Sequence, residues 1–426
     1  MKTILKFIKI WYQKVLSSIA FYPILIGFLF FLLAVVSLSL ESIKLISEFK
    51  SNFSFLFIQD KETSQTILST LIGGILSLTV FSFSMVMVVL NQASANYSPR
   101  LLPGLISDKR NQLILGFYIG TLTYCMIILI SLGAYGVKTN SFGLSTMISA
   151  MLSIACVGFF VYFIHSISRT IQINTIIKTL FRKSDRSLNK AIKEQSKENT
   201  IAIPKNIQNK ESITANTTGY YKDFDSSFLE QSFIKNNNIL EILVHQNQKT
   251  WEGETIAKIN TNLSEEAIKE IRLCFNIVND RLESENSVSN MVKLTEIAVR
   301  ALSPGVNDPG TAIDVINYVG ILLKKAAQLT DTYCINPKGN LKIIHHNVPF
   351  KEIFRKVIQP IRLYAKSDAS VMYELISMLT HLMKTAKSAT TNYEPIVTNE
   401  LNNIKNDIET HISNPDDLKN LLQAMK

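Results

Sequence analysis

The sequence predicts a mainly α-helical integral membrane protein, in which four transmembrane helices are followed by a cytoplasmic α+β region. Hydrophobic residues make up 47% of the 426 residues and charged residues 18%, whereas ordinary soluble domains hold roughly 25% charged residues. No Asp, Glu, Lys or Arg occurs in residues 15–40, 63–99, 111–137 or 139–168. Each run exceeds the about 20 residues that a helix needs to cross a bilayer. The composition therefore excludes a soluble globular enzyme and predicts a transmembrane domain over residues 1–168.

The four spans are expected at about residues 16–40, 65–92, 112–136 and 143–167. The first span has the basic N-terminal flank of a signal peptide but about twice the usual apolar length, and no small-residue cleavage site precedes Glu41, so it is interpreted as an uncleaved anchor. With the N-terminus inside, the inner flanks carry 13 Lys and Arg residues and the outer flanks carry 4. Basic flanks are enriched on the cytoplasmic side. This asymmetry predicts a multi-pass protein of the bacterial inner membrane with both termini in the cytoplasm.

The formal charge of +10 does not indicate a nucleic-acid partner. The 44 basic residues are spread along the chain, and the excess near the membrane follows from the preference for basic cytoplasmic flanks. The four cysteines form no Cys-x-x-Cys pair, so free thiols are expected, and neither disulfides nor a zinc site.

The second uncharged run is longer than a bilayer requires. As one helix its 37 residues would reach about 55 Å, against a hydrocarbon core of about 30 Å. Small and polar residues recur along one side of it: Thr70, Gly73, Ser77, Ser84, Asn91, Ser94 and Ser98. This stripe is either a packing seam or the lining of a water-filled pore, with Asn91, Gln92 and Arg100 near the inner mouth. Arg100 would then either favour anions or anchor the helix end at the headgroups. Four spans form a thin bundle, so both interpretations predict a homo-oligomer.

Residues 169–218 are expected to form a basic amphipathic helix and a linker. The helix would lie with its apolar side on the inner leaflet, where Lys and Arg attract anionic lipid. Residues 219–260 predict a small β module with a turn at Gly253. Its turn sequence EGE resembles that of lipoyl- and biotinyl-type β-hammerheads, but no lysine stands at a hairpin tip, so no cofactor is expected. Residues 261–426 have helical periodicity, starting from an N-cap at Ser264.

The most specific string is ALSPGVNDPGTA, residues 301–312. It predicts a helix–loop–helix corner in which Asp308 caps a helix that starts with Pro309. The alternative is a docking site for a cytoplasmic partner or ligand. The residues considered for it are Arg281, Arg300, Ser303, Pro304, Gly305, Asn307, Asp308 and Pro309. The adjacent His345 and His346 are poorly spaced for two metal ligands on a helix. No catalytic constellation is recognised, so neither an enzyme nor a metal site is predicted.

Two blocks carry a resemblance to a known family. TLIGGILSLTVFSFSMVMVVLNQASANYSPRLL (residues 70–102) and LTEIAVRALSPGVNDPGTAID (residues 294–314) resemble the signature blocks of a family of bacterial predicted membrane proteins, a domain of unknown function. The likeness spans nearly the whole chain. The chain departs from the family pattern at RLESEN (residues 281–286), where the family tends to have Arg-Thr followed by Gln-Asp. The resemblance implies the order of spans, β module and helical end, and it implies no activity.

Two functional hypotheses follow from these observations. The first is an oligomeric, channel-like permeation pathway gated by the cytoplasmic domain. The second is a membrane-anchored sensor or scaffold whose cytoplasmic corner binds a partner or ligand. They differ in what the stripe on the second span faces.

Overall fold

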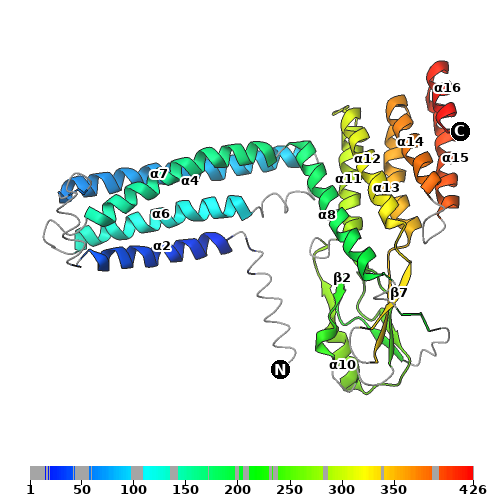
Figure 1. The fold of residues 1–426 in the computed structure, drawn as a ribbon, viewed down its shortest axis with the longest axis horizontal. Helices are drawn as coiled ribbons and strands as arrows, with labels where there is room; N and C mark the ends of the chain where they lie inside the picture. The colour runs from blue at the N-terminus through cyan, green and yellow to red at the C-terminus, as the bar shows by residue number, and fades with distance from the viewer. Residues whose placement is uncertain are drawn as a thin grey trace. The chain divides into compact units, whose positions relative to one another are not determined.

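The computed structural model describes residues 15, 18, 20–41, 43, 57, 58, 60–96, 109–134, 143–170, 172–196, 201–204, 211–229, 233, 238–281, 286–336, 340–385 and 393–425. The chain divides into two compact units (Figure 1). The span unit ends at Gln172, and the C-terminal unit begins at Ile173.

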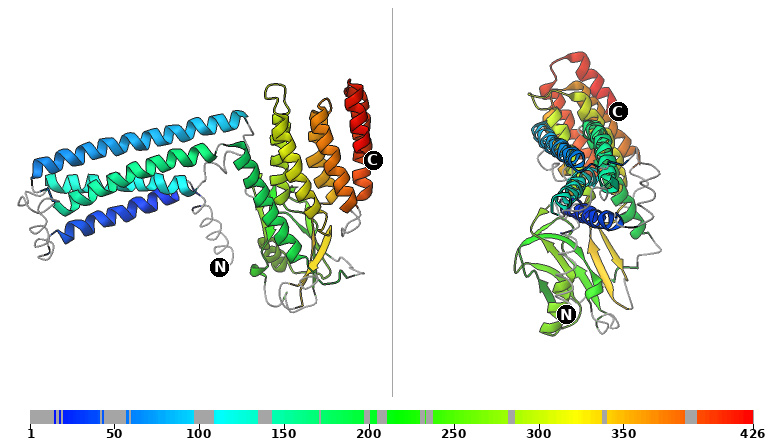
Figure 2. Two further views of the ribbon diagram at one scale, coloured as in Figure 1. Left: turned by 45° about the horizontal axis from the view of Figure 1, so that its top comes forward. Right: turned by 90° about the vertical axis from the view of Figure 1, so that its left-hand side faces the viewer.

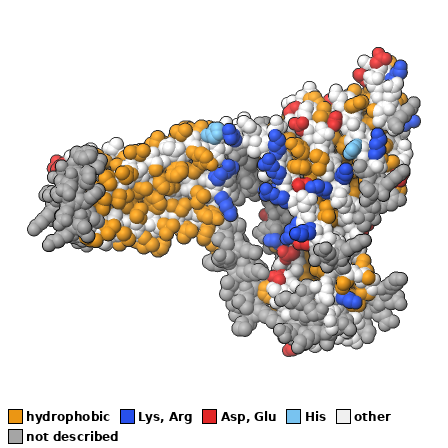
Figure 3. Space-filling model, in the orientation of Figure 1, with side chains coloured by type: hydrophobic (Ala, Val, Ile, Leu, Met, Phe, Trp, Pro, Cys, Tyr) orange, Lys and Arg blue, Asp and Glu red, His pale blue; other side chains and the backbone are white. Residues whose placement is uncertain are grey.

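The span unit consists of four long apolar helices that lie alongside one another (Figures 1 and 2). They are α2 (Phe21–Leu40), α4 (Lys61–Asn96), α6 (Lys109–Ala134) and α7 (Gly143–Thr170). All four are long and apolar enough to cross a membrane, and hydrophobic side chains cover most of the face seen in Figure 3. The predicted fold class is therefore confirmed. Helix α4 has 36 residues and so reaches about 54 Å.

Helix α6 packs against each of the other three spans, and two of its glycines permit the closest approach. A Cβ atom on Gly116 would lie 2.7 Å from Ile26 Cδ1 and 3.1 Å from Pro23 Cα, and one on Gly120 would lie 2.8 Å from the ring of Phe30. The two glycines are four residues apart, so both face α2. Small residues at this spacing allow membrane helices to pack backbone against backbone.

Polar groups lie inside the bundle near the end of α2. The Tyr124 hydroxyl donates to Ser37 Oγ over 2.9 Å, and the Ser145 backbone N–H donates to Glu41 Oε1 over 2.7 Å. Glu41 is only 8% exposed, although the sequence analysis placed it just outside the first span. Such bonds hold spans together in lipid, where burial of apolar surface does not drive association between helices.

Two sheets form the lower layer of the C-terminal unit in Figure 1. Five strands run in the order β1-β5-β3-β8-β7: β1 (Glu211–Thr214), β3 (Ile239–Ile242), β5 (Thr255–Ile259), β7 (Thr332–Ile335) and β8 (Lys342–His346). Only β3 and β8 pair in parallel in this sheet. The second sheet has the order β4-β2-β6: β2 (Gly219–Phe224), β4 (Lys249–Thr250) and β6 (Phe275–Val278). Helix α10 (Glu265–Cys274) buries Ile271 and Cys274 in the shared core.

The strands extend beyond residues 219–260, the range predicted for the β module. Strand β1 falls in the predicted linker, and β6, β7 and β8 fall in the predicted helical domain. A short hairpin is only marginally stable alone, and strands distant in sequence complete both sheets. The predicted turn is present, since Gly253 has a φ of +83°, a conformation that glycine adopts without a Cβ clash.

Helices form the other layer of the C-terminal unit. They are α8 (Ile173–Glu194), α11 (Ser287–Ala301), α12 (Pro309–Ala326), α13 (Phe350–Ala365), α14 (Ala369–Thr385), α15 (Glu394–His411) and α16 (Pro415–Ala424). The predicted N-cap of α10 is confirmed, because Ser264 Oγ accepts from the Ala267 N–H over 3.3 Å. Arg362 on α13 joins that helix to α15 through Glu400 and Asp407.

The predicted placement of α8 on the membrane surface needs correction. Its apolar side is buried within the C-terminal unit: Ile176, Ile177, Leu180 and Leu188. This side packs on α11 and α12, and the Phe181 ring lies 4.8 Å from that of Tyr318. The basic side, with Arg182, Lys183 and Arg186, is exposed. Figure 3 shows Lys and Arg side chains gathered around the position of α8. The apolar side of α8 is therefore covered by protein, where the sequence analysis expected it to lie on lipid.

Candidate functional site

The polar stripe of α4 faces away from the helices of its own chain. Every residue of the predicted stripe whose side chain the structure describes is exposed: Thr70, Gly73, Ser77, Ser84, Asn91 and Gln92. No atom of another residue lies within 4 Å of a Cβ built on Gly73. The Ser94 side chain, Ser98 and Arg100 lie outside the described residues. The stripe is therefore not a packing seam within one chain.

The bundle is held by the opposite side of α4. Its buried positions include Leu68, Ile75, Ser82 and Val89, which repeat every seven residues. Thr70, Ser77, Ser84 and Asn91 repeat with the same spacing but are shifted by two residues, or about 200° around the helix. The 21 helical steps from Thr70 to Asn91 cover about 32 Å, close to the thickness of the hydrocarbon core. One side of α4 thus packs on its own chain, and the outward side carries a line of polar residues among exposed apolar side chains such as Val80, Phe81 and Val88.

The string at residues 301–312 forms the predicted corner. Asp308 Oδ1 accepts from the Thr311 N–H over 3.1 Å, and Asp308 Oδ2 accepts from the Thr311 hydroxyl over 2.6 Å. Pro309 is the first residue of α12. The Asn307 N–H donates to the Ser303 carbonyl over 3.0 Å, and Asn307 has a φ of 48°. Ser303 is half-buried, whereas Pro304 and Gly305 are exposed. Both oxygens of the Asp308 carboxylate serve the cap, which accounts for the motif as a structural element.

Arg281 does not belong to this corner, contrary to the sequence analysis. Its Nε donates to Asn247 Oδ1 over 3.4 Å, and the Asn247 amide donates to Ser289 Oγ over 2.7 Å. Ser289 lies in the first turn of α11, whereas Arg300 lies in its last turn. A 15-residue helix is about 22 Å long. The structure therefore separates Arg281 from Arg300, Asn307 and Asp308.

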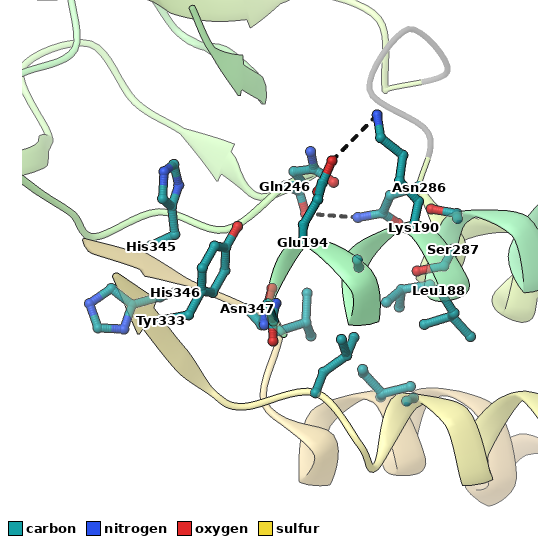
Figure 4. A pocket seen from close by; sticks show the side chains of 18 of the residues that line it. Leu188, Lys190, Glu194, Gln246, Asn286, Ser287, Tyr333, His345, His346 and Asn347 are labelled. Atoms are coloured by element: carbon teal, nitrogen blue, oxygen red, sulfur yellow. Dashed lines mark hydrogen bonds and ion pairs between the residues drawn. The ribbon is translucent and has the colours of Figure 1, made fainter. Parts of the chain in front are cut away.

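A cavity beside α8 was not anticipated from the sequence. It measures about 310 Å³ and is bounded by α8, β2, the start of α11 and the ends of β7 and β8. In Figure 4, Lys190 and Glu194 of α8 lie on one side, and Tyr333, His345 and Asn347 lie on another. The Tyr333 and His345 rings are stacked, with centroids 5.2 Å apart and an interplanar angle of 14°.

The electrostatics of the cavity are governed by burial. Burial, with a smaller effect of His346, lowers the pKa of His345 to about 4, so this imidazole is neutral near pH 7. Burial, helped by the charge of Glu194, raises the pKa of Tyr333 to about 12. His345 Nε2 is buried, and none of the residues that the structure describes is its hydrogen-bond partner. Leaving a buried polar atom unsatisfied costs free energy.

The two adjacent histidines therefore have different surroundings. His346 Nδ1 lies 3.0 Å from the Thr332 hydroxyl and His346 Nε2 lies 3.1 Å from Glu241 Oε1, whereas His345 stacks on Tyr333. Neighbouring residues of a strand point to opposite faces of the sheet, which is why two histidines adjacent in β8 have different contacts. Among the described residues, no three His, Cys, Asp or Glu side chains are grouped as a metal site would require.

Comparisons with known proteins agree with this architecture. The family described as "Predicted membrane protein (DUF2254)" matches residues 16–381, or 366 of the 426 residues. The chain is 23% identical over 342 residues to "Uncharacterized protein Mb1321c" of Mycobacterium bovis and to "Uncharacterized protein Rv1290c" of Mycobacterium tuberculosis. Each alignment covers 74% of this chain and 61% of the mycobacterial protein, so the chain spans less than two thirds of these relatives. No solved structure matches the chain significantly.

Proposed function

We propose a function for this chain, which belongs to the predicted membrane protein family DUF2254. Copies of the chain assemble through the outward face of α4 around a channel-like permeation pathway. The observation that carries the proposal is the exposure of Thr70, Ser77, Ser84 and Asn91 on the side of α4 opposite its own bundle. Polar side chains at one face of a span line either water or another helix. The C-terminal unit, joined to the spans through α8, would gate the pathway.

Assembly through this face can be tested by cysteine cross-linking. All four native cysteines are buried, so they form a low background for an oxidant. We expect Ser77→Cys to give disulfide-linked dimers in native membranes. Leu76→Cys is the matched control, because Leu76 is also exposed but points about 100° away. Equal cross-linking at both positions, or none at Ser77, would contradict assembly through the polar face.

Permeation requires a separate experiment. Purified oligomer in liposomes would be assayed for ion flux as wild type, Ser84→Leu and Phe83→Leu. Ser84→Leu narrows and dries a pore lined by this face and should abolish the flux. Phe83→Leu changes an exposed apolar position about 100° away from Ser84 around the helix and should leave the flux unchanged. Absence of flux from a folded oligomer, under varied voltage and tension, would rule out the channel and leave the oligomer.

The proposed orientation places both termini in the cytoplasm of a bacterium and the spans in its inner membrane. It rests on the excess of Lys and Arg in the inner flanks, 13 against 4. A C-terminal reporter that fluoresces only in the cytoplasm should be active, and a C-terminal periplasmic reporter should be inactive. The opposite pair of results would reverse the topology.

The second candidate function is a membrane-anchored sensor. The cavity beside α8 favours it, because α8 is separated from the last span by only two residues and lines the cavity. Under this alternative, the α4 face mediates assembly and does not line a permeation pathway. Cross-linking at Ser77 without ion flux is the combination of results that would favour the sensor over the channel.

A further inference from the structure

We propose that the cavity beside α8 binds a small molecule that carries a nucleobase, of nucleoside size and without a requirement for phosphate. The inference concerns the C-terminal unit alone, and it holds whether or not the spans conduct. It rests on the size of the cavity, the balance of its charges and the chemistry of the side chains that bound it.

The size of the cavity suits a small ligand. Ligand pockets occupy about 300–1,000 Å³, and this cavity, at about 310 Å³, lies at the lower end of that range. Its lining combines apolar side chains such as Leu188, Met291 and Ile353 with a larger number of polar ones. Polar groups in such a lining fix the orientation of a bound molecule.

The charges do not favour an anion. Among the described lining residues Lys190 is the only lysine or arginine, and its Nζ lies 3.7 Å from Glu194 Oε1. Asp223 adds a second carboxylate to the lining. His345 is neutral near pH 7, and His346 is engaged by Thr332 and by the carboxylate of Glu241. A phosphate group would thus meet two acids and one already paired base.

The rings and polar groups instead suit a flat heterocycle. Tyr333 lies stacked on His345, so its orientation is fixed before a ligand arrives. Bases stack on aromatic side chains without needing a particular sequence or charge.

Glu194 and Gln246 complete the recognition. Both lie at the cavity in Figure 4. A carboxylate accepts from the exocyclic amine of a base, and a glutamine amide both donates and accepts, as an adenine edge requires. The cavity thus presents a ring platform, an acceptor and an amide on side chains from separate elements of one unit.

The test is calorimetric titration of the full chain in lipid nanodiscs with adenosine, guanosine, cytidine and uridine, each alone. We expect saturable binding of at least one nucleoside, with one site per chain. Tyr333→Leu and Glu194→Gln should each weaken that binding at least tenfold. Glu194→Gln is a conservative change of an exposed side chain, so it tests the site without endangering the fold. Tyr364→Leu, at an exposed tyrosine of α13 that does not line the cavity, should leave the affinity unchanged.

Three outcomes would overturn the proposal. The first is no binding of any of the four nucleosides to folded protein. The second is binding that survives both Tyr333→Leu and Glu194→Gln, which would place the ligand elsewhere. The third is binding of spermidine or of inorganic phosphate, titrated as comparison probes, with no binding of a nucleoside, because the cavity would then select for charge.

Discussion

Replacing Arg362 by methionine should loosen the attachment of α15 to α13. Arg362 Nε donates to Glu400 Oε1 over 2.8 Å, and its Nη1 donates to Asp407 Oδ2. The Arg362 and Glu400 side chains are 11% and 12% exposed, and that of Asp407 is 21% exposed. Burial acts to lower the pKa of Arg362, but the two carboxylates outweigh it and hold this pKa above its ordinary value. The variant therefore leaves two neighbouring carboxylates without their cation.

The expected magnitude follows from the burial of the pair. Removing one partner of a buried ion pair costs about 3–5 kcal/mol, and about 3 kcal/mol applies here because Asp407 keeps some contact with water. At 1.36 kcal/mol per factor of ten, this corresponds to a roughly 150-fold rise in the opening constant of α15. Hydrogen–deuterium exchange of the full chain in nanodiscs should show it at amides around Ile404 and Ile408, both buried.

A matched variant on the same helix provides the control. Lys405 lies 3.9 Å from Glu409, and both side chains are about half exposed. Lys405→Met should therefore change the opening free energy by less than about 1 kcal/mol. If Arg362→Met and Lys405→Met changed the exchange of α15 equally, the network would not hold α15 in place.

Three further predictions concern a buried histidine, a helix cap and a close helix contact. Burial lowers the pKa of His345 from 6.5 to about 4. Between about pH 6.5 and pH 4 the unfolded chain therefore binds a proton that the folded chain does not. Thermal unfolding should show the free energy of unfolding falling by up to about 1.4 kcal/mol per pH unit towards pH 4. His345→Gln should flatten this dependence, and an unchanged slope would contradict it. Asp308→Ala should cost about 1 kcal/mol of thermal stability through the lost cap, whereas Asp308→Asn should cost much less; equal losses would argue for a role of the charge beyond capping. Gly116→Ala should destabilise the span unit by about 1–3 kcal/mol in detergent titrations. Gly133→Ala is the control and should not destabilise it, because an added Cβ there meets no described atom within 4 Å. An equal effect of the two substitutions would refute the contact of Gly116 with α2.

Features set by local sequence could be predicted. The four spans follow from uncharged runs longer than a bilayer requires. The caps at Ser264 and Asp308 follow from side chains that bond to amides two or three residues away. The turn at Gly253 follows from a conformation that favours glycine. In each case the deciding interaction lies within a few residues of the chain.

Features that depend on distant contacts could not be predicted. The apolar side of α8 suits lipid and protein equally, and only the positions of α11 and α12 decide between them. The cavity combines α8 with residues near 221, 246, 286 and 333, which no short motif relates. The separation of Arg281 from Asp308 likewise depends on α11 lying between them.

The residues on the outward face of α4 differ in the free energy that it costs to expose them to lipid. Thr70 and Ser77 donate their hydroxyls to the carbonyls of Thr66 and Gly73 over 2.9 Å, so these two groups are satisfied even in lipid. Gly73 is different, because a glycine inside a helix costs about 1 kcal/mol relative to alanine and none of the described residues uses the space it leaves. Asn91 adds an exposed amide at the far end of the same face. Water or a neighbouring α4 would offset both costs, since water solvates the amide and a second helix can use the space at Gly73. Lipid does neither, which is why we expect this face to be covered in the membrane.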